Sequence, residues 1–312
     1  MLDLGQLHKN TVYKNQGTPY SLTRTITENG QPDILFHWHT DVEMIYVHEG
    51  TAKFHIDQEY FNSKAGDIIL IRPNALHSIH PIENQKHYMD ALNFQLDLMG
   101  YSAMDQASID YLQPLYKGEL DFVHVIEPHH KGYEAIRSCL IETMETGYHR
   151  KGYFEFQIKA QLNQLFYLLF ENGYVVSKTQ SLEGYRKEEK IRTIIDYINL
   201  HYQEELTIDH LANICSYSAT HFMNFFKKHI GISCMEFLIQ FRLRKATELL
   251  QHSNLSVLEI ASQSGFNNLS NFNRQFKKYY QMTPRQYRQD YMDSHPELAK
   301  PKTTRNRSRK TA

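Results

Sequence analysis

The sequence has little cysteine, and its cysteines follow no pairing pattern. Cys139, Cys215 and Cys234 are the three cysteines in 312 residues, and their spacing matches neither a disulfide framework nor a zinc motif. Buried thiols in a reducing compartment are the simplest interpretation. This excludes a small secreted domain that depends on disulfides.

Long apolar runs are also absent from the sequence. No stretch approaches the roughly 18 apolar residues of a membrane helix, and the N-terminus has no basic segment followed by an apolar one. We therefore expect a cytoplasmic protein that makes no contact with a membrane. Phosphate-binding loops, dinucleotide-binding glycine motifs and Ser-His-Asp signatures are missing too, so nothing indicates those enzyme chemistries.

The net charge of −1 conceals two parts of opposite sign. From Arg186 onward there are 20 Lys and Arg against 12 Asp and Glu, whereas the preceding part has 14 against 23. A basic C-terminal part indicates binding to nucleic acid, and the acidic part then has another task. The chain length also favours two domains.

One pattern occurs twice near the C-terminal end, at an offset of 49 to 50 residues. Both copies have an alanine, an aromatic residue, a phenylalanine, a Phe-Lys-Lys triplet and a closing aromatic residue in the same order. These are Ala212, Tyr217, Phe222, Phe226, Lys227, Lys228 and Phe237, then Ala261, Phe266, Phe272, Phe276, Lys277, Lys278 and Tyr287. Each copy predicts a helix, a tight turn and a second helix, which is a helix-turn-helix motif.

The second helix of each copy separates apolar and polar residues onto two faces. Phe222 and Phe226, like Phe272 and Phe276, would pack inward. The other face can contact DNA, because Asn and Arg pair with base edges and Lys neutralises phosphate. The predicted DNA-contacting residues are Thr220, Met223, Asn224, Lys227, Asn268, Ser270, Asn273, Arg274 and Lys277. A single hairpin could equally be a solvated surface, but two copies favour DNA binding.

This region resembles the DNA-binding domain of AraC/XylS-type transcriptional regulators. The resemblance is carried by Ile260-Ala261, Gly265-Phe266, Phe272, Phe276-Lys277-Lys278, Thr283-Pro284 and Tyr287-Arg288. Gln281 stands where glycine is usual, and Cys234 where proline is frequent. The resemblance implies an all-α domain with two helix-turn-helix motifs, a homodimer on double-stranded DNA and, in an activator, contact with RNA polymerase.

The N-terminal part contains short β-type runs separated by Gly, Pro and Asn. They are Ile34–Trp38, Val42–Val47, Ala52–Ile56, Asp67–Ile71 and Tyr88–Gln95. Such runs predict an antiparallel barrel or sandwich. From about Tyr101 to Gln180 the pattern becomes helical, with a stripe at Ile158, Leu162, Leu165, Phe166 and Leu169. The stripe predicts packing onto the barrel or a dimer interface.

Four polar residues stand out within the β-type runs. His37, His39 and Glu43 share one side of an extended segment because alternate residues project to the same face. A later strand can bring His77 to meet them. Three imidazoles and a carboxylate can hold Zn, Mn, Fe or Ni, although the same residues could line a ligand pocket or serve the structure.

These two segments resemble the paired motifs of the cupin barrel. His37, His39 and Glu43 match the first motif, whereas the second departs from it because Ala75 replaces a glycine and His77 comes one residue early. In AraC-type regulators such a barrel often holds a small effector such as a sugar. The resemblance therefore implies a ligand site at these histidines and Glu43. It adds Arg24, just before the first barrel strands, which could equally be a surface charge. No cofactor is required, and a divalent metal at the three histidines and Glu43 is the alternative.

The predicted fold class is α+β, with an antiparallel cupin-like barrel and following helices before the all-α domain. We expect an effector domain with an N-terminal arm at 1–100, a helical dimerisation segment at 101–177, a linker at 178–189, a DNA-binding domain at 190–290 and a basic disordered tail at 291–312. The predicted function is an effector-responsive DNA-binding regulator that is not an enzyme. The alternative is a metal-dependent cupin enzyme fused to a DNA-binding domain.

Overall fold

The computed structural model of the chain describes residues 11–13, 19–27, 34–57, 59–82, 86–178 and 182–294. It divides into two compact units. The first comprises Met1–Tyr202 and Leu206–Gln240, and the second Gln203–Glu205 and Phe241–Ala312. The division falls inside one helix, α7 (Cys234–His252).

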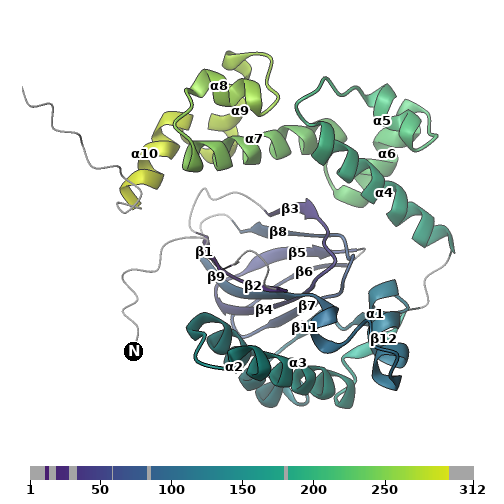
Figure 1. Ribbon diagram of the computed structural model, residues 1–312. Coiled ribbons are helices and arrows are strands. Elements are labelled where there is room, and N and C mark those ends of the chain that lie inside the picture. The colour runs from purple at the N-terminus through teal and green to yellow at the C-terminus, as the bar shows by residue number, and fades with distance from the viewer. Residues whose placement is uncertain are drawn as a thin grey trace, which may run out of the picture. The chain divides into compact units, whose positions relative to one another are not determined.

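Two antiparallel sheets form the N-terminal part of the first unit (Figure 1). The six-stranded sheet has the order β1 (Thr11–Tyr13), β2 (Tyr20–Thr27), β9 (His87–Phe94), β4 (Val42–Glu49), β7 (Ile68–Ile71) and β11 (Val125–Ile126). The four-stranded sheet has the order β3 (Ile34–His37), β8 (His77–Pro81), β5 (Ala52–Ile56) and β6 (Glu59–Asn62). The predicted antiparallel fold is confirmed, as two sheets rather than a closed barrel in the described residues.

The alternation of side chains along each strand builds two apolar layers. Ile45 and Val47 of β4 lie between the sheets, where they join a cluster with Phe54 and Ile79 of the four-stranded sheet. Their neighbour Met44 points to the other face of the six-stranded sheet and packs against helices. Because successive strand residues face opposite sides, one strand serves both layers.

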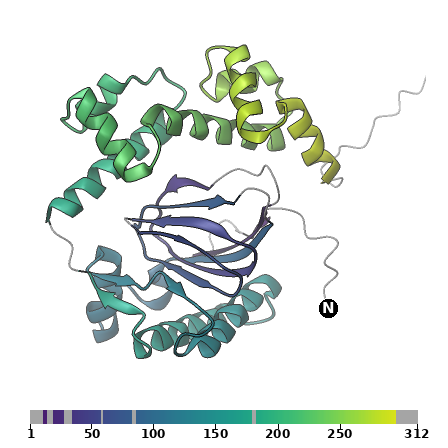
Figure 2. The same ribbon diagram turned by 180° about the vertical axis from the view of Figure 1, so that it is seen from behind.

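Helices α2 (Tyr133–His149) and α3 (Phe154–Glu171) cover the outer face of the six-stranded sheet (Figures 1 and 2). The predicted stripe on α3 is buried here with Leu22 and Met44, so it packs onto the sheet. Gly147 lets α2 approach β2 closely, because a Cβ at this position would lie 2.7 Å from Leu22 Cδ1.

The segment expected to be helical also contains short strands. Along the chain follow η2 (Leu96–Met99), η3 (Ser108–Leu112) and α1 (Gln113–Lys117). Strand β10 (Leu120–Phe122) then pairs with β12 (Val175–Ser177) in a separate two-stranded sheet. The segment 101–177, expected to be helical, thus contains strands as well as helices, because β10 and β12 pair across more than 50 residues.

The basic C-terminal part is all-α in the described residues. Its helices are α4 (Leu182–His201), α5 (Ile208–Ile214), α6 (Ala219–Ile230), α7, α8 (Val257–Gln263), α9 (Leu269–Tyr280) and α10 (Pro284–Ser294). Helix α4 begins inside the segment expected to be a linker, so residues 182–189 are helical. Most of the predicted N-terminal arm and the tail beyond Ser294 lie outside the described residues. None of the described helices has the length and apolar content needed to cross a membrane.

Candidate effector site and DNA-contacting helices

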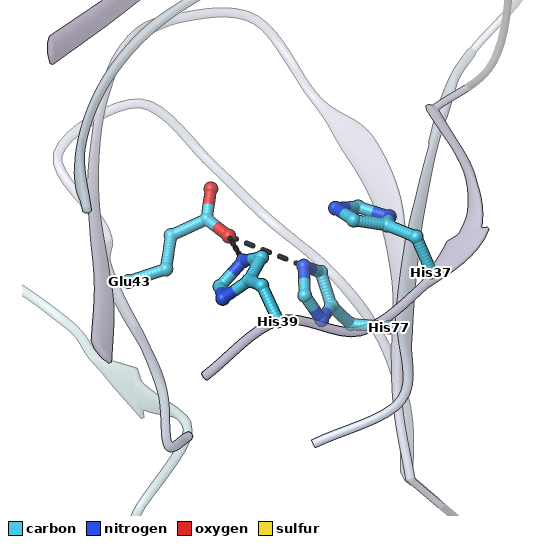
Figure 3. Close-up of side chains that lie close together, drawn as sticks. All are labelled: His37, His39, Glu43 and His77. Atoms are coloured by element: carbon cyan, nitrogen blue, oxygen red, sulfur yellow. Dashed lines mark hydrogen bonds and ion pairs between the residues drawn. The ribbon is translucent and has the colours of Figure 1, made fainter. Parts of the chain in front are cut away.

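The structure brings His37, His39, Glu43 and His77 together. His37 ends β3 and is the cross-strand partner of His77 at the start of β8, whereas Glu43 comes from β4 of the other sheet. One ligand atom from each of the four residues lies within 4.8 Å of the others. Figure 3 shows the Glu43 carboxylate pointing toward His39 and His77, with His37 beside them.

Backbone carbonyl groups fix the tautomer of all three histidines. Nδ1 of His37 donates to Leu35 O at 2.9 Å. Nδ1 of His39 likewise donates to Asp41 O at 3.0 Å, and Nδ1 of His77 to Ala75 O at 2.9 Å. Because a carbonyl oxygen only accepts, each Nδ1 carries a proton, and Nε2 of the neutral ring presents a lone pair.

Two of these lone pairs face the same carboxylate oxygen. Nε2 of His39 and Nε2 of His77 each lie 3.1 Å from Glu43 Oε2. Glu43 and His77 are buried, with 8% and 1% exposure, and His77 Nε2 finds no hydrogen-bond donor among the described residues. Acceptors this close need a positive charge between them, supplied either by a proton on an imidazole or by a cation.

The electrostatics of the cluster suit a cation. Burial, with His77 beside it, lowers the pKa of His37 to about 3, so its ring is neutral at physiological pH. Burial would raise the pKa of Glu43, but His39 and His77 hold it well below its usual value. Burial would lower the pKa of His39, and Glu43 reverses this and raises it. Three imidazole nitrogens and one carboxylate oxygen are the donor set of a divalent transition metal, so these residues fit one.

Arg24 does not join this site, contrary to the sequence-based expectation. Its guanidinium pairs with Asp90, with Nε–Oδ1 and Nη2–Oδ2 distances of 2.8 Å, and lies 5.1 Å from the Tyr148 ring of α2. The register pairs Arg24 with Asp90 on the helix-covered face of the sheet, whereas Glu43 points between the sheets. Arg24 therefore stabilises the outer face.

Asn93 is a site residue that sequence reasoning missed. It is the β9 partner of Glu43, and its Nδ2 lies 3.4 Å from His39 Nε2. Its place beside the histidines follows from the pairing of β4 with β9, which no local pattern reveals.

The two repeats form helix-turn-helix motifs with matching turns. Helices α5 and α6 meet at Ser216, which has φ 56°, and α8 and α9 meet at Gly265, which has φ 86°. The two residues are 49 positions apart, as the repeat predicts. Ser218 caps α6 by accepting from His221 N, and Asn268 caps α9 by accepting from Asn271 N.

The second helix of each motif has one buried and one exposed face. Phe222 and Phe226 of α6 and Phe272 and Phe276 of α9 are fully buried. All nine predicted DNA-contacting residues are exposed: Thr220, Met223, Asn224, Lys227, Asn268, Ser270, Asn273, Arg274 and Lys277. Arg274 Nη2 donates to an oxygen of Asn271 at 3.0 Å, one turn earlier on α9.

Comparisons with known proteins agree with both parts of the chain. Residues 22–166 match the AraC-like ligand binding domain, and residues 211–290 match a helix-turn-helix domain. The HTH-type transcriptional regulator YdeC of Bacillus subtilis is 24% identical over 266 residues, covering 85% of this chain and 89% of YdeC. The regulator YdiP of Escherichia coli is 26% identical over 265 residues, covering 80% of this chain and 79% of YdiP.

Among solved structures, ToxT from Vibrio cholerae is similar to the chain. It has 14% sequence identity and a TM-score of 0.47, over 87% of this chain and 98% of ToxT. The first domain match covers most of the two sheets with α2 and most of α3, and the second covers most of the paired motifs. The chain thus belongs to the AraC family of DNA-binding transcriptional regulators, with an N-terminal ligand-binding domain.

Proposed function

We propose that the chain is a cytoplasmic regulator whose binding to specific promoter DNA responds to a small effector held by His37, His39, Glu43 and His77. The convergence of these four side chains inside the ligand-binding domain carries this proposal. The exposed faces of α6 and α9 provide the DNA contacts, through the nine residues named above. The protein acts as a homodimer through its 101–177 segment, and as an activator it contacts RNA polymerase.

The geometry favours an effector that includes a divalent transition-metal ion. A cation would supply the positive charge that the lone pairs of His39, His77 and Glu43 require. A sugar, which the family resemblance implies, needs several hydrogen-bonding groups beside an aromatic wall. The apolar cluster between the two sheets is mainly aliphatic. It includes Ile71, Ala75 and Ile79, which are close to His77 in the sequence, and this suits a sugar less well.

The three histidines and Glu43 would hold the ion, and their backbone hydrogen bonds would keep the rings oriented. An ion bound there would join the four-stranded sheet, through His37 and His77, to the six-stranded sheet, through Glu43. The alternative of a metal-dependent enzyme rests on the same residues. Turnover of a small substrate by the metal-loaded protein would favour it, whereas we expect a change in DNA affinity without turnover.

The test is capture of the organism's own genomic fragments by the purified protein at one near-physiological salt concentration. Captures are compared without addition, with Ni²⁺ or Zn²⁺, and with a panel of sugars. We expect a few promoter fragments whose capture changes with the metal, and a His77→Ala variant that captures them without this change. A response to one sugar alone would replace the metal proposal, and the absence of selective capture would contradict DNA regulation.

A further inference from the structure

A group of four charges, three of them on buried side chains, lies beside the site. Arg72 Nη2 lies 2.6 Å from Asp57 Oδ2, and Arg72 Nε lies 3.2 Å from Asp121 Oδ2. Lys178 Nζ lies 2.9 Å from each of the same two carboxylates. The Arg72, Asp57 and Asp121 side chains are at most 8% exposed. Two acids and two bases therefore balance, and each acid contacts both bases.

The connection Arg72–Leu76 joins this charge cluster to the histidine site. On the side of the site, Asn74 N donates to His39 O at 2.8 Å, and His77 Nδ1 donates to Ala75 O. On the side of the cluster, Leu76 N donates to Asp57 Oδ1 at 3.0 Å, and Asp57 N donates to Leu76 O at 2.7 Å. The backbone of the connection Arg72–Leu76 is thus hydrogen-bonded to His39 of the site and to Asp57 of the charge cluster.

Lys178 places the cluster at the exit of the ligand-binding domain. It follows β12 directly, and its backbone N donates to Glu119 O at 2.9 Å. It precedes Leu182, the first residue of α4, by only four positions. The chain therefore leaves the ligand-binding domain toward the DNA-binding helices from a residue that is bonded to Asp57.

We propose that Asp57 and Lys178 couple the occupancy of the histidine site to the start of α4, through the connection Arg72–Leu76. This rests on the proposed function, in which a cation is the effector or part of it. A cation bound to His39 and His77 would hold the connection at two points. His39 accepts a hydrogen bond from Asn74 N, and His77 directly follows Leu76. Asp57 contacts this segment at Arg72 and Leu76 and also binds Lys178, so a shift of the segment is passed to Lys178 through Asp57.

The coupling requires two conformations of the connection Arg72–Leu76 that bind the cation with different affinities. Without a cation, no common centre holds His39, His77 and Glu43 together, so the start of β8 is held less tightly. With a cation, the same three groups attract a common centre, which favours a closed connection. Reciprocity then requires that bound promoter DNA changes the cation affinity of the wild type by the same factor.

The test uses the full chain and a charge-balanced double variant, Lys178→Met with Asp121→Asn. It removes one base and one acid, so Arg72 keeps Asp57 and Leu76 keeps its hydrogen bond. The single variant Lys178→Met is the second probe, and circular dichroism checks that each is folded. The matched control is Lys64→Met, since the Lys64 side chain is 73% exposed and its ammonium lies 3.6 Å from the partly exposed Glu127.

Two quantities are measured with Ni²⁺ as the probe. The first is Ni²⁺ affinity by calorimetry, expected to stay within about 3-fold in all variants because the ligands are untouched. The second is the ratio of affinities for a captured promoter fragment with and without Ni²⁺. We expect a ratio of about 5- to 150-fold in the wild type and the control, and a ratio within about 2-fold of one in the double variant. Hydrogen exchange at Val175–Lys178 provides a readout without DNA, with Ni²⁺-dependent protection in the wild type but not in the double variant.

Each outcome separates the two proposals. A Ni²⁺ response of both DNA affinity and exchange that persists in the double variant overturns the coupling and leaves the proposed function standing. Ni²⁺ binding that changes neither readout in the wild type overturns the coupling and the role of the ion as effector. Absence of Ni²⁺ binding removes the metal itself, and the coupling with it.

Discussion

The histidine site and the outer faces of α6 and α9 hold their polar side chains in opposite ways. At the site, every imidazole is fixed by a backbone carbonyl and the carboxylate is buried. On α6 and α9 the nine candidate residues are exposed. A fixed set suits a small ligand of defined geometry, because little freedom is lost on binding. An exposed set can adjust to the groove of a larger partner.

A second group of the same residue types shows why orientation matters more than composition. Glu127, His129 and His130 also gather within ligand distance of one another, and they are partly or fully exposed. Here Glu127 N donates to Nδ1 of His130 at 3.1 Å, so neutral His130 carries its proton on Nε2. That N–H group, rather than a lone pair, faces the Glu127 carboxylate, with Nε2 3.6 Å from it. This second group therefore needs no cation.

The largest effect should come from removing a buried imidazole of the first group. We expect His77→Ala to weaken Ni²⁺ binding by at least about 100-fold, because loss of a mere supporting group around a metal costs about 10- to 100-fold. Calorimetry with the full chain measures this. His130→Ala is the matched control and should leave the affinity unchanged. The reverse pattern would contradict the contrast between the two groups.

On the exposed faces, single side chains should have smaller and separable effects. We expect Arg274→Ala to cost about 1–3 kcal/mol on the captured promoter fragment and less on random DNA, since guanidinium contacts to bases carry sequence preference. Lys277→Ala should weaken both DNAs alike and reduce the salt dependence, as a phosphate contact does. Binding titrations at two salt concentrations measure this. Equal losses for Arg274→Ala on both DNAs would refute its base-reading role.

The stability contributed by the buried Asp57 carboxylate should depend on pH more strongly than that of an exposed carboxylate. Burial would raise the pKa of Asp57, but Arg72 and Lys178 lower it to about 2 from 3.8. Asp57 therefore contributes on the order of 2 kcal/mol above its unfolded pKa, and this is lost as the pH falls toward 2.

The advantage of the wild type over Asp57→Asn in unfolding free energy should accordingly shrink between about pH 4 and pH 2. Chemical denaturation across this range measures it. Glu49→Gln serves as a control, because Glu49 is half exposed and pairs with Lys86 at the surface, so little change is expected. A difference for Asp57→Asn that is constant with pH would show that its charge does not stabilise the fold.

The smallest effect concerns the turn that presents α6. Ser216 adopts the left-handed conformation that Gly265 adopts in the second motif, and a non-glycine residue there costs about 1 kcal/mol or slightly more. We expect Ser216→Gly to stabilise the first motif by about 1 kcal/mol, seen as a higher melting temperature, without a change in DNA affinity. Destabilisation by this substitution would mean that the serine side chain matters more than the backbone.

Most of the fold could be predicted where the signal is local. The run Ala52–Ile56 coincides with β5, and the repeat located both helix-turn-helix motifs because apolar spacing and turn residues lie within one short segment. The predicted runs did not include β1, β2, β6, β10, β11 and β12. All but β2 have four residues or fewer, and each forms by pairing with another strand, so its own residues carry little signal.

The site was predictable only in part, for the same reason. Alternation placed His37, His39 and Glu43 on one side, and the structure brings His77 to them. The resemblance suggested Arg24 for the site, but its side of the sheet depends on the register between β2 and β9, which the sequence does not reveal. The contacts of Asp57 with Lys178 join residues 121 positions apart, and no local pattern indicates them.

The burial of His77 and Glu43 would affect the rate at which the proposed ion is released, as well as its affinity. With 1% and 8% exposure, these two residues would release the proposed ion to water only when the site opens locally. Release would then be as slow as that opening, whatever the concentration of free ion outside. A regulator built in this way would keep its transcriptional state for some time after the stimulus has gone, and brief fluctuations of the effector would be filtered out.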